Sequence, residues 1–221
     1  MNTSEDPATL QRRIQELESE IQTQKAEIKR LRDENRRWAR LAGTESTTGL
    51  PNKISFMRAM VPQAIQRASR ESKPAGFMLL SADNLGDVNE SYGREAGDRV
   101  IQGLAELLQS LLEEDDRLGH LDGTNFAVIF YPADLDTVRG RANMLRARIR
   151  SHAFPCAGET VPITASVGIG SVDPEDNPNA RAVGEEIFRL LNGALYRAKK
   201  AGGNRVEAIE AASAGRKESN R

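Results

Sequence analysis

The chain has 221 residues, 38% of them hydrophobic, which is enough for one sizeable core and an additional segment. Its 31 basic and 32 acidic residues nearly cancel, so its charge gives no reason to expect binding to nucleic acid or to an anionic membrane. The single Cys156 excludes an internal disulfide and a multi-cysteine metal site. No stretch resembles a signal peptide or reaches the roughly 20 apolar residues that cross a bilayer, so we expect a cytoplasmic protein.

Residues 8–43 contain a heptad repeat, in which apolar residues follow one another at spacings of four and three. The residues at its two core positions include Leu10, Ile14, Leu17, Ile21, Ile28, Leu31, Asn35 and Trp38. Isoleucine at one core position with leucine at the other favours two parallel strands, and Asn35 would fix their register. We therefore predict a coiled-coil stalk, about 50 Å long, that forms a parallel homodimer. The alternative is a single amphipathic helix packed on its own domain, for which a stripe of two residues in seven is too narrow.

The remainder, at 44–209, alternates helical and strand patterns. A linker from Gly43 to Thr48 leads to a helix that Asn52 is expected to cap and that Pro62 is expected to kink or to split in two. The predicted elements, in chain order, are a helix at 53–72, a strand at 76–82, a polar loop at 83–97, a helix at 96–112, hairpin strands at 117–121 and 125–131, a helix at 134–151, a loop at 152–161, a strand at 163–172, a helix at 180–201 and an edge strand at 205–209. This order predicts one α/β domain with a mixed central sheet flanked by helices. The tail at 210–221 is predicted to be disordered.

Two local patterns give finer predictions. Asp122-Gly123 stands between two apolar runs, which is a strong signal for a β-hairpin. A type I′ turn there requires φ > 0 at both central residues, and Asp and Gly tolerate this conformation. On the helix at 134–151, the residues predicted to face inward are Val138, Met144, Leu145 and Ile149.

Five short motifs occur in an order and at spacings that resemble one known family. They are Thr48–Lys53, Asn89–Gly93 with Ala96–Asp98, the hairpin at Asp122–Phe126, Thr164–Gly168, and Ala194–Lys199 followed by Gly202–Asn204. Together they resemble the GGDEF domain of diguanylate cyclases over about residues 45–208. The resemblance implies the palm-like fold of nucleotidyl cyclases. Active members of that family join two GTP molecules into cyclic di-GMP when two domains face each other, usually under a dimerising coiled coil.

The resemblance also implies which residues of this chain stand at the catalytic positions. The five positions of the GGDEF signature are occupied by Asp122-Gly-Thr-Asn-Phe126. The two metal-binding acids fall on Ser81 and Thr124, and the glutamate of the fourth position becomes Asn125. Hydroxyl groups are poor ligands for Mg²⁺ compared with carboxylates, because they bring no charge to offset its dehydration. No catalytic residue and no metal site are therefore predicted.

The substrate-binding positions are only partly kept. The two residues that would read guanine are present as Asn89 and Asp98, and one phosphate-binding lysine is present as Lys199. A second phosphate-binding lysine and an arginine fall on Gly86 and Gly203. In the inhibitory product-binding motif, Arg-x-x-Asp, the arginine is replaced by Glu113.

Each of these residues also has a simpler interpretation. Asn89 could bond to its own loop backbone, while Asp98 and Lys199 stand at helix ends where their charges are favourable in any case. Three acids, Asp83, Asp87 and Asp122, could rebuild a metal site, although a turn and a strand end explain two of them. No metal spacing or neighbouring base marks out the remaining candidates, so a structural role is predicted for His120, His152 and Cys156.

Two classes of function follow. The first is a catalytically inactive, GGDEF-like dimeric module for signalling or scaffolding, which binds a protein partner and could hold GTP or another guanine nucleotide without converting it. It needs no cofactor. The alternative is a diguanylate cyclase with an altered metal site, which would require Mg²⁺. The chemistry of the catalytic positions favours the first class.

Overall fold

The structure is a computed structural model that describes residues 7–156, 158–174 and 179–209. It divides the chain into two units, Met1–Ala42 and Gly43–Arg221. The tail predicted to be disordered, at 210–221, lies outside the described residues. Among the described residues, no helix is long and apolar enough to cross a membrane.

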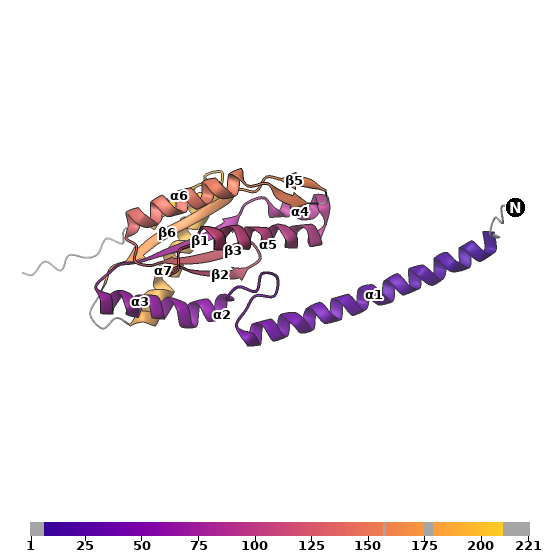
Figure 1. Cartoon of the computed structure of the whole chain (residues 1–221), viewed down its shortest axis with the longest axis horizontal. Helices are drawn as coiled ribbons and strands as arrows, with labels where there is room; N and C mark the ends of the chain where they lie inside the picture. Colours follow the sequence, from indigo (N-terminus) through magenta and orange to yellow (C-terminus); the bar gives the residue numbers. More distant parts are fainter. Residues whose placement is uncertain (1–6, 157, 175–178, 210–221) are drawn as a thin grey trace, which may run out of the picture. The chain divides into compact units, whose positions relative to one another are not determined.

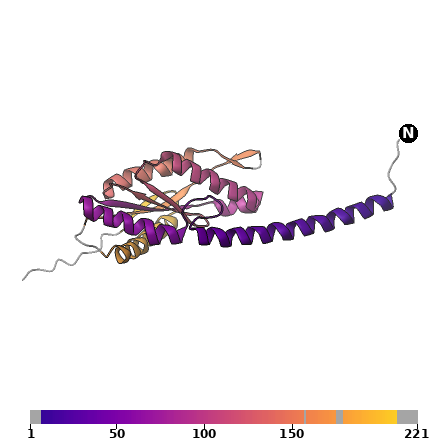
Figure 2. The same ribbon diagram turned by 60° about the horizontal axis from the view of Figure 1, so that its bottom comes forward.

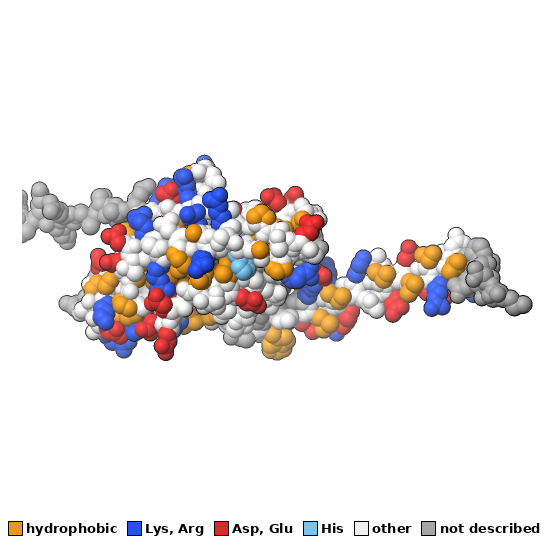
Figure 3. All heavy atoms as spheres, turned by 45° about the horizontal axis from the view of Figure 1, so that its top comes forward, with side chains coloured by type: hydrophobic (Ala, Val, Ile, Leu, Met, Phe, Trp, Pro, Cys, Tyr) orange, Lys and Arg blue, Asp and Glu red, His pale blue; other side chains and the backbone are white. Residues whose placement is uncertain are grey.

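The first unit contains one long helix, α1 (Pro7–Ala42), which confirms the predicted N-terminal helix. The apolar residues of the heptad are exposed on it, from 44% for Leu10 to 69% for Trp38. Figure 3 shows hydrophobic side chains recurring along α1 between charged ones. A continuous stripe of exposed leucine and isoleucine on a helix usually marks a surface that binds another apolar surface.

The second unit is built on a five-stranded sheet in the order β2-β3-β1-β6-β7. Its strands are β1 (Ala75–Ala82), β2 (Arg117–Asp122), β3 (Asn125–Phe130), β6 (Ala165–Val172) and β7 (Val206–Ala208). The central strand β1 runs antiparallel to both β3 and β6, and the edge strand β7 runs parallel to β6. The sheet is therefore mixed, as predicted.

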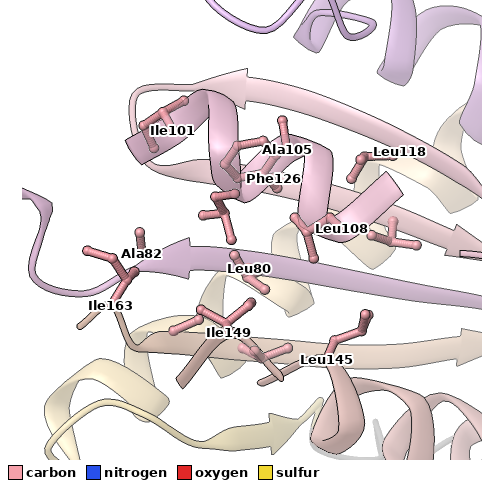
Figure 4. Packing of buried hydrophobic residues seen from close by; sticks show 14 of the residues in the cluster. Leu80, Ala82, Ile101, Ala105, Leu108, Leu118, Phe126, Leu145, Ile149 and Ile163 are labelled. Carbon is pink, nitrogen blue, oxygen red and sulfur yellow. The ribbon is translucent and has the colours of Figure 1, made fainter. Parts of the chain in front are cut away.

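Helices cover both faces of this sheet (Figures 1 and 2). They are α3 (Val61–Glu71), α4 (Leu85–Tyr92), α5 (Arg94–Leu111), α6 (Leu135–Ser151) and α7 (Ala180–Lys200). Because alternate residues of a strand point to opposite faces, Met78 and Leu80 of β1 join the core under α5 and α6. Phe77 and Leu79 join a second core under α3 and α7. Figure 4 shows the first core, with Leu80 between residues of α5 and α6.

The segment after the linker is helical throughout but changes its winding. Helix α2 (Lys53–Ser55) is capped by Asn52, whose side chain accepts a hydrogen bond from the Ser55 amide at 3.0 Å, as predicted. A π-helical stretch, η1 (Phe56–Met60), follows and leads into α3. Pro62 stands at the start of α3, where its missing N–H is tolerated. The expected disturbance at Pro62 is thus a wider turn just before it.

Three predictions in this unit are wrong. The polar loop at 83–97 contains helix α4 and the start of α5, because Leu85 and Val88 are spaced to bury one helical face. The loop at 152–161 contains a small hairpin of β4 (Phe154–Cys156) and β5 (Glu159–Val161), so Cys156 lies on a strand, buried and unoxidised. Met144 of α6 is 39% exposed, and Ala142 is buried in its place.

Candidate functional site

The candidate site lies where several segments meet at one end of the sheet. In the strand register, Ser81 at the end of β1 stands opposite Asn125 of β3 on one side and Ser166 of β6 on the other. The Ala82 amide also donates a hydrogen bond to the carbonyl oxygen of Thr124, at 3.1 Å. The structure therefore brings Ser81 and the hairpin tip together, as the family resemblance implies.

The hairpin forms as predicted, but its turn differs from the predicted type I′. Asp122 pairs with Asn125, so the two central residues are Gly123 and Thr124, and only Gly123 has a positive φ, of 44°. A positive φ at the first central residue alone is the pattern of a type II′ turn, in which glycine takes that place. Asp122 keeps a local role, because its carboxylate accepts a hydrogen bond from the Asn125 amide group. A shift of register between His120 and Asp122 accompanies the change.

The two positions that would hold metal carry hydroxyl groups that bond to each other. Ser81 is fully buried, and its Oγ lies 2.8 Å from Oγ1 of Thr124. One hydroxyl donates and the other accepts, so each side chain has a hydrogen-bond partner within the protein. The pair closes the gap between β1 and the hairpin tip.

The neighbouring Asp83 carboxylate also accepts hydrogen bonds from other parts of the protein. Its Oδ2 accepts hydrogen bonds from Thr164 Oγ1 at 2.7 Å and from the Asn204 amide at 2.9 Å, and its Oδ1 accepts one from Ser166 Oγ. These bonds fasten the start of β6 and the loop after α7 to the end of β1. Asp83 is thus a structural link between three segments.

This set of groups does not fit a Mg²⁺ ion. Magnesium prefers an octahedron of oxygen ligands that includes one or two carboxylates. Among the residues that the structure describes, no group of three or more His, Cys, Asp or Glu side chains is placed to hold a metal. Of the three acids that could rebuild a metal site, Asp83 and Asp122 make the protein contacts described above, and Asp87 is exposed on α4.

The two guanine-reading candidates lie on neighbouring helices. Asn89 is half-buried on α4, and Asp98 is exposed in the first turns of α5. The side chain of Asn89 packs on the backbone of Gly97, where an added Cβ would lie only 2.0 Å from Asn89 Oδ1. Gly97 therefore makes room for the amide of Asn89.

The phosphate-binding positions carry less positive charge than those of the family. Lys199 is exposed near the end of α7, and the loop that follows it turns back through Gly203 and Asn204 to Asp83. Gly203 has a φ of 72°, and a Cβ there would lie 3.2 Å from the Asp83 carboxylate. Gly86 is exposed on α4, with open space where a side chain would begin. The glycines at these two positions supply no cation.

A contact between His120 and Glu45 supports the hairpin, and sequence reasoning missed it. His120 is 2% exposed, with its Nδ1 at 2.8 Å from Glu45 Oε2 and its Nε2 at 2.9 Å from the carbonyl oxygen of Gly123. The ring also stacks on Phe126 at a centroid distance of 4.4 Å. A histidine flanked by Gly119 and Leu121 in a strand was the only available signal. The prediction of a structural role for His120 agrees with this position.

The Glu45 carboxylate gives a pH-dependent prediction. Burial by itself raises the pKa of Glu45. Hydrogen bonds from His120, Thr48 and Thr47, together with the electrostatic effect of His120, lower the pKa by more, so that it falls from 4.5 to about 2. A lowered folded-state pKa stabilises the fold above pH 4.5, and this contribution is lost as the pH falls toward 2. Because solvent screens this partly exposed carboxylate, the free energy of unfolding should fall by roughly 1–2 kcal/mol more in the native protein than in Glu45→Gln between about pH 5 and pH 3.

Urea unfolding at a series of pH values measures this difference. Glutamine keeps the size of the side chain and can still accept hydrogen bonds from the Thr47 and Thr48 amides, which lie 2.9 and 3.0 Å from the carboxylate. Parallel pH profiles for the two proteins would mean that the Glu45 carboxylate is not stabilised by the fold.

A buried ion pair lies just before β2. The Asp116 carboxylate is fully buried and receives two hydrogen bonds from the Arg141 guanidinium, one of them at 3.0 Å, and one from the Glu113 amide at 2.8 Å. The exposed Glu113 carboxylate lies 3.6 Å from the same guanidinium. Asp116 of the altered Arg-x-x-Asp motif is therefore turned inward and already bound by Arg141.

Comparison with known proteins identifies the family of the chain. Residues 42–205 match the family described as "Diguanylate cyclase, GGDEF domain". The chain is 30% identical over 198 residues to the diguanylate cyclase DgcP of Pseudomonas aeruginosa, and 31% identical over 162 residues to the cyclic di-GMP phosphodiesterase PdeR of Escherichia coli. These alignments cover 90% and 73% of this chain, but only 28% and 23% of the two relatives.

A solved structure matches both parts of the chain. It is the coiled coil and GGDEF domain of DgcB from Caulobacter crescentus, in complex with c-di-GMP, with a TM-score of 0.66 and 25% sequence identity. The match covers 87% of this chain and 98% of that one. The family match extends over most of the chain and takes in both the strand end at Ser81 and the hairpin tip. The chain therefore belongs to the GGDEF family.

Proposed function

We propose that the chain is a non-catalytic GGDEF protein, in which a coiled-coil stalk pairs two domains that act as a signalling or scaffold module. The hydrogen bond between the Ser81 and Thr124 hydroxyls carries this proposal. It occupies the place where an active member of the family would hold a metal ion, and it leaves no carboxylate there to bind one.

The effect of this change on the rate would be large. Phosphoryl and nucleotidyl transfer depend on positioning and on cations that neutralise the charge developing on the phosphate. At the corresponding positions this chain has two hydroxyls, and Gly86 and Gly203 replace two cationic residues. Loss of both the metal ligands and most of the phosphate-binding charge removes the main sources of transition-state stabilisation.

The base-reading pair is kept, so the proposal includes binding of a guanine nucleotide without conversion. Because no metal contributes, the affinity for GTP should be the same in Mg²⁺ and in EDTA, and GDP should bind about as well as GTP. Calorimetric titration of the full chain measures both comparisons. Asn89→Ala and Asp98→Ala should each weaken binding at least about tenfold, which corresponds to a lost hydrogen bond of roughly 1.4 kcal/mol. Asn143→Ala, on the exposed face of α6, is the control.

A glycine substitution tests the same pocket without removing a polar group. Gly97→Ala places a methyl group 2.0 Å from Asn89 Oδ1, so the amide must move away from its position against Gly97. We expect Gly97→Ala to weaken guanine binding about as much as Asn89→Ala. Gly103→Ala on the same helix is the matched control, because its methyl group would make an ordinary contact with Phe154 at 3.5 Å. Unchanged affinity in Gly97→Ala would place the guanine site elsewhere.

The dimeric part of the proposal is supported by the exposed heptad residues of α1 and by the similar structure, which contains a coiled coil. The alternative, a working cyclase, is favoured by one observation, the 30% identity to a protein named as a diguanylate cyclase. Incubation with GTP and Mg²⁺ or Mn²⁺ separates the two functions.

A further inference from the structure

We propose that Glu45 and His120 form a proton-dependent latch, which holds the segment that follows the stalk against the hairpin tip only while both ring nitrogens of His120 carry a proton. The latch consists of Glu45, Thr48, His120 and the Gly123 carbonyl. This inference does not rest on the absence of catalysis and applies to the domain whatever its activity.

The charge state of Glu45 follows from its partners. Its Oε2 accepts hydrogen bonds from the Thr47 amide at 2.9 Å, the Thr48 amide at 3.0 Å and the Thr48 hydroxyl at 3.1 Å. A protonated carboxyl oxygen would present a hydrogen to these donors, whereas a carboxylate accepts all of them. These contacts agree with the lowered pKa of Glu45, about 2. Glu45 is therefore a carboxylate at neutral pH.

The proton positions on His120 then follow from geometry. Nδ1 lies 2.8 Å from the Glu45 carboxylate, so it must donate a proton to that contact. Nε2 lies 2.9 Å from the Gly123 carbonyl oxygen, which is an acceptor only, so it must donate as well. Neutral imidazole has one donor and one acceptor nitrogen and can satisfy only one of these contacts. Both contacts together require the imidazolium ion.

The surroundings of the ring are consistent with a buried cation. Phe126 stacks on the imidazole with an angle of 9° between the rings, which places a π-face against the positive charge. Glu45 is the charged group in contact with the ring. Asp122, two residues further along β2, faces Lys53 at 3.9 Å instead, and both of these side chains are more than half exposed. The charge of His120 is thus balanced mainly by Glu45.

The position of the latch lets the proton state of His120 act on the hairpin tip. Residues 43–52 connect the stalk to the domain, and their backbone meets β2 where the His120 amide donates to the Pro51 carbonyl at 3.0 Å. On the other side, the His120 ring holds the carbonyl of Gly123, and the next residue, Thr124, bonds to Ser81. Loss of either ring proton would leave an unshared electron pair facing an acceptor, at Nδ1 2.8 Å from the Glu45 carboxylate or at Nε2 2.9 Å from the Gly123 carbonyl oxygen, and would break that contact.

Nuclear magnetic resonance of the full chain labelled with ¹⁵N-histidine tests the proton positions directly. The chain has two histidines, so the exposed His152 is an internal reference in the same spectrum. At pH 7, both nitrogens of His120 should have the chemical shifts of protonated nitrogens, while His152 should behave as an exposed histidine. A neutral tautomer of His120 at pH 7 would overturn the proposal.

Two further readouts test the latch itself. As the pH is raised, the amide signals of Thr47, Thr48 and Thr124 should shift with the same midpoint as the His120 ring, because they lie beside the two groups, Glu45 and the Gly123 carbonyl, that bond to this ring. In Glu45→Gln, His120 should lose one ring proton at pH 7, and the amide signals that change should be those of the latch residues and their direct neighbours. In Thr48→Val, which keeps the carboxylate, both ring protons should remain. Independent midpoints, or a doubly protonated His120 in Glu45→Gln, would contradict the proposal.

Discussion

A variant with Ile21→Asp and Ile28→Asp is expected to be a monomer at concentrations where the native chain is a dimer. Both isoleucines occupy the same core position of the heptad and are about half exposed on α1, at 47% and 49%. Burial of each isoleucine against a second stalk contributes about 1.5–3 kcal/mol, and a dimer buries four of them. Aspartate removes this contribution and brings like charges into the seam. The dissociation constant should rise by at least about a thousandfold.

Light scattering coupled to gel filtration measures this change. The matched control carries Gln22→Asp and Lys29→Asp, which add the same residue type one position further along the exposed helix. The control should remain a dimer, because these positions lie outside the apolar stripe. A monomeric native chain, or equal dissociation of the variant and the control, would show that the stripe on α1 is covered by something other than a second copy.

Replacement of Arg141 by alanine is expected to destabilise the domain by about 3–5 kcal/mol, because the Asp116 carboxylate would remain buried without its cation. Arg141 also lies over the Phe130 ring, 4.5 Å from its centroid, so packing is lost as well. Denaturant unfolding measures the change. Arg139→Ala, an exposed arginine of the same helix, is the control and should change the stability by no more than about 0.5 kcal/mol.

The double variant Asp116→Asn with Arg141→Ala identifies the cause of the loss. Asparagine has no charge and can still accept the hydrogen bond from the Glu113 amide, so the double variant should be more stable than Arg141→Ala alone. Equal stability of the two proteins would mean that the loss comes from the contact with Phe130 and not from the uncompensated charge.

The elements with strong local patterns were predictable from the sequence. The apolar runs of β1 and β6 and the apolar faces of α5 and α7 are clearly bounded by polar residues. Their predicted positions therefore agree with the structure within a few residues. The hairpin was predictable because Asp122-Gly123 interrupts two apolar runs. Its turn type was not, because the register shift beside Asp122 moves the turn by one residue, and local sequence does not determine such shifts.

The wrong predictions concern short elements that depend on distant partners. Helix α4 contains Gly86 and ends at Gly93, so its local propensity is low, and its formation rests on burial of Leu85 and Val88 against the rest of the core. The β4–β5 hairpin is three residues on each side and contains Pro155, and Phe154 is fully buried there. Met144 was assigned inward because its side chain is apolar, although Ala142 fits the closer contact at the core.

The candidate site was predicted by position but not by contact. Alignment of motifs placed Ser81 and Thr124 at one site, and the structure brings their hydroxyls to 2.8 Å. The contact between His120 and Glu45 joins residues 75 positions apart, and the contact between Asp116 and Arg141 joins residues 25 apart. No periodicity or motif in the sequence indicates either pair, so only the folded chain shows that these residues are partners.

The most direct test of the proposed function is the reaction that it excludes. The full chain at high concentration is incubated with GTP and either Mg²⁺ or Mn²⁺, and the nucleotides are separated by chromatography. A diguanylate cyclase of the same family serves as the positive control. We expect GTP to remain unconverted with both metals, because Ser81 and Thr124 give the metal no carboxylate. Formation of cyclic di-GMP in proportion to the amount of the native chain would contradict a non-catalytic function. A Ser81→Ala variant, purified in the same way, should then form no cyclic di-GMP if the activity belongs to this site.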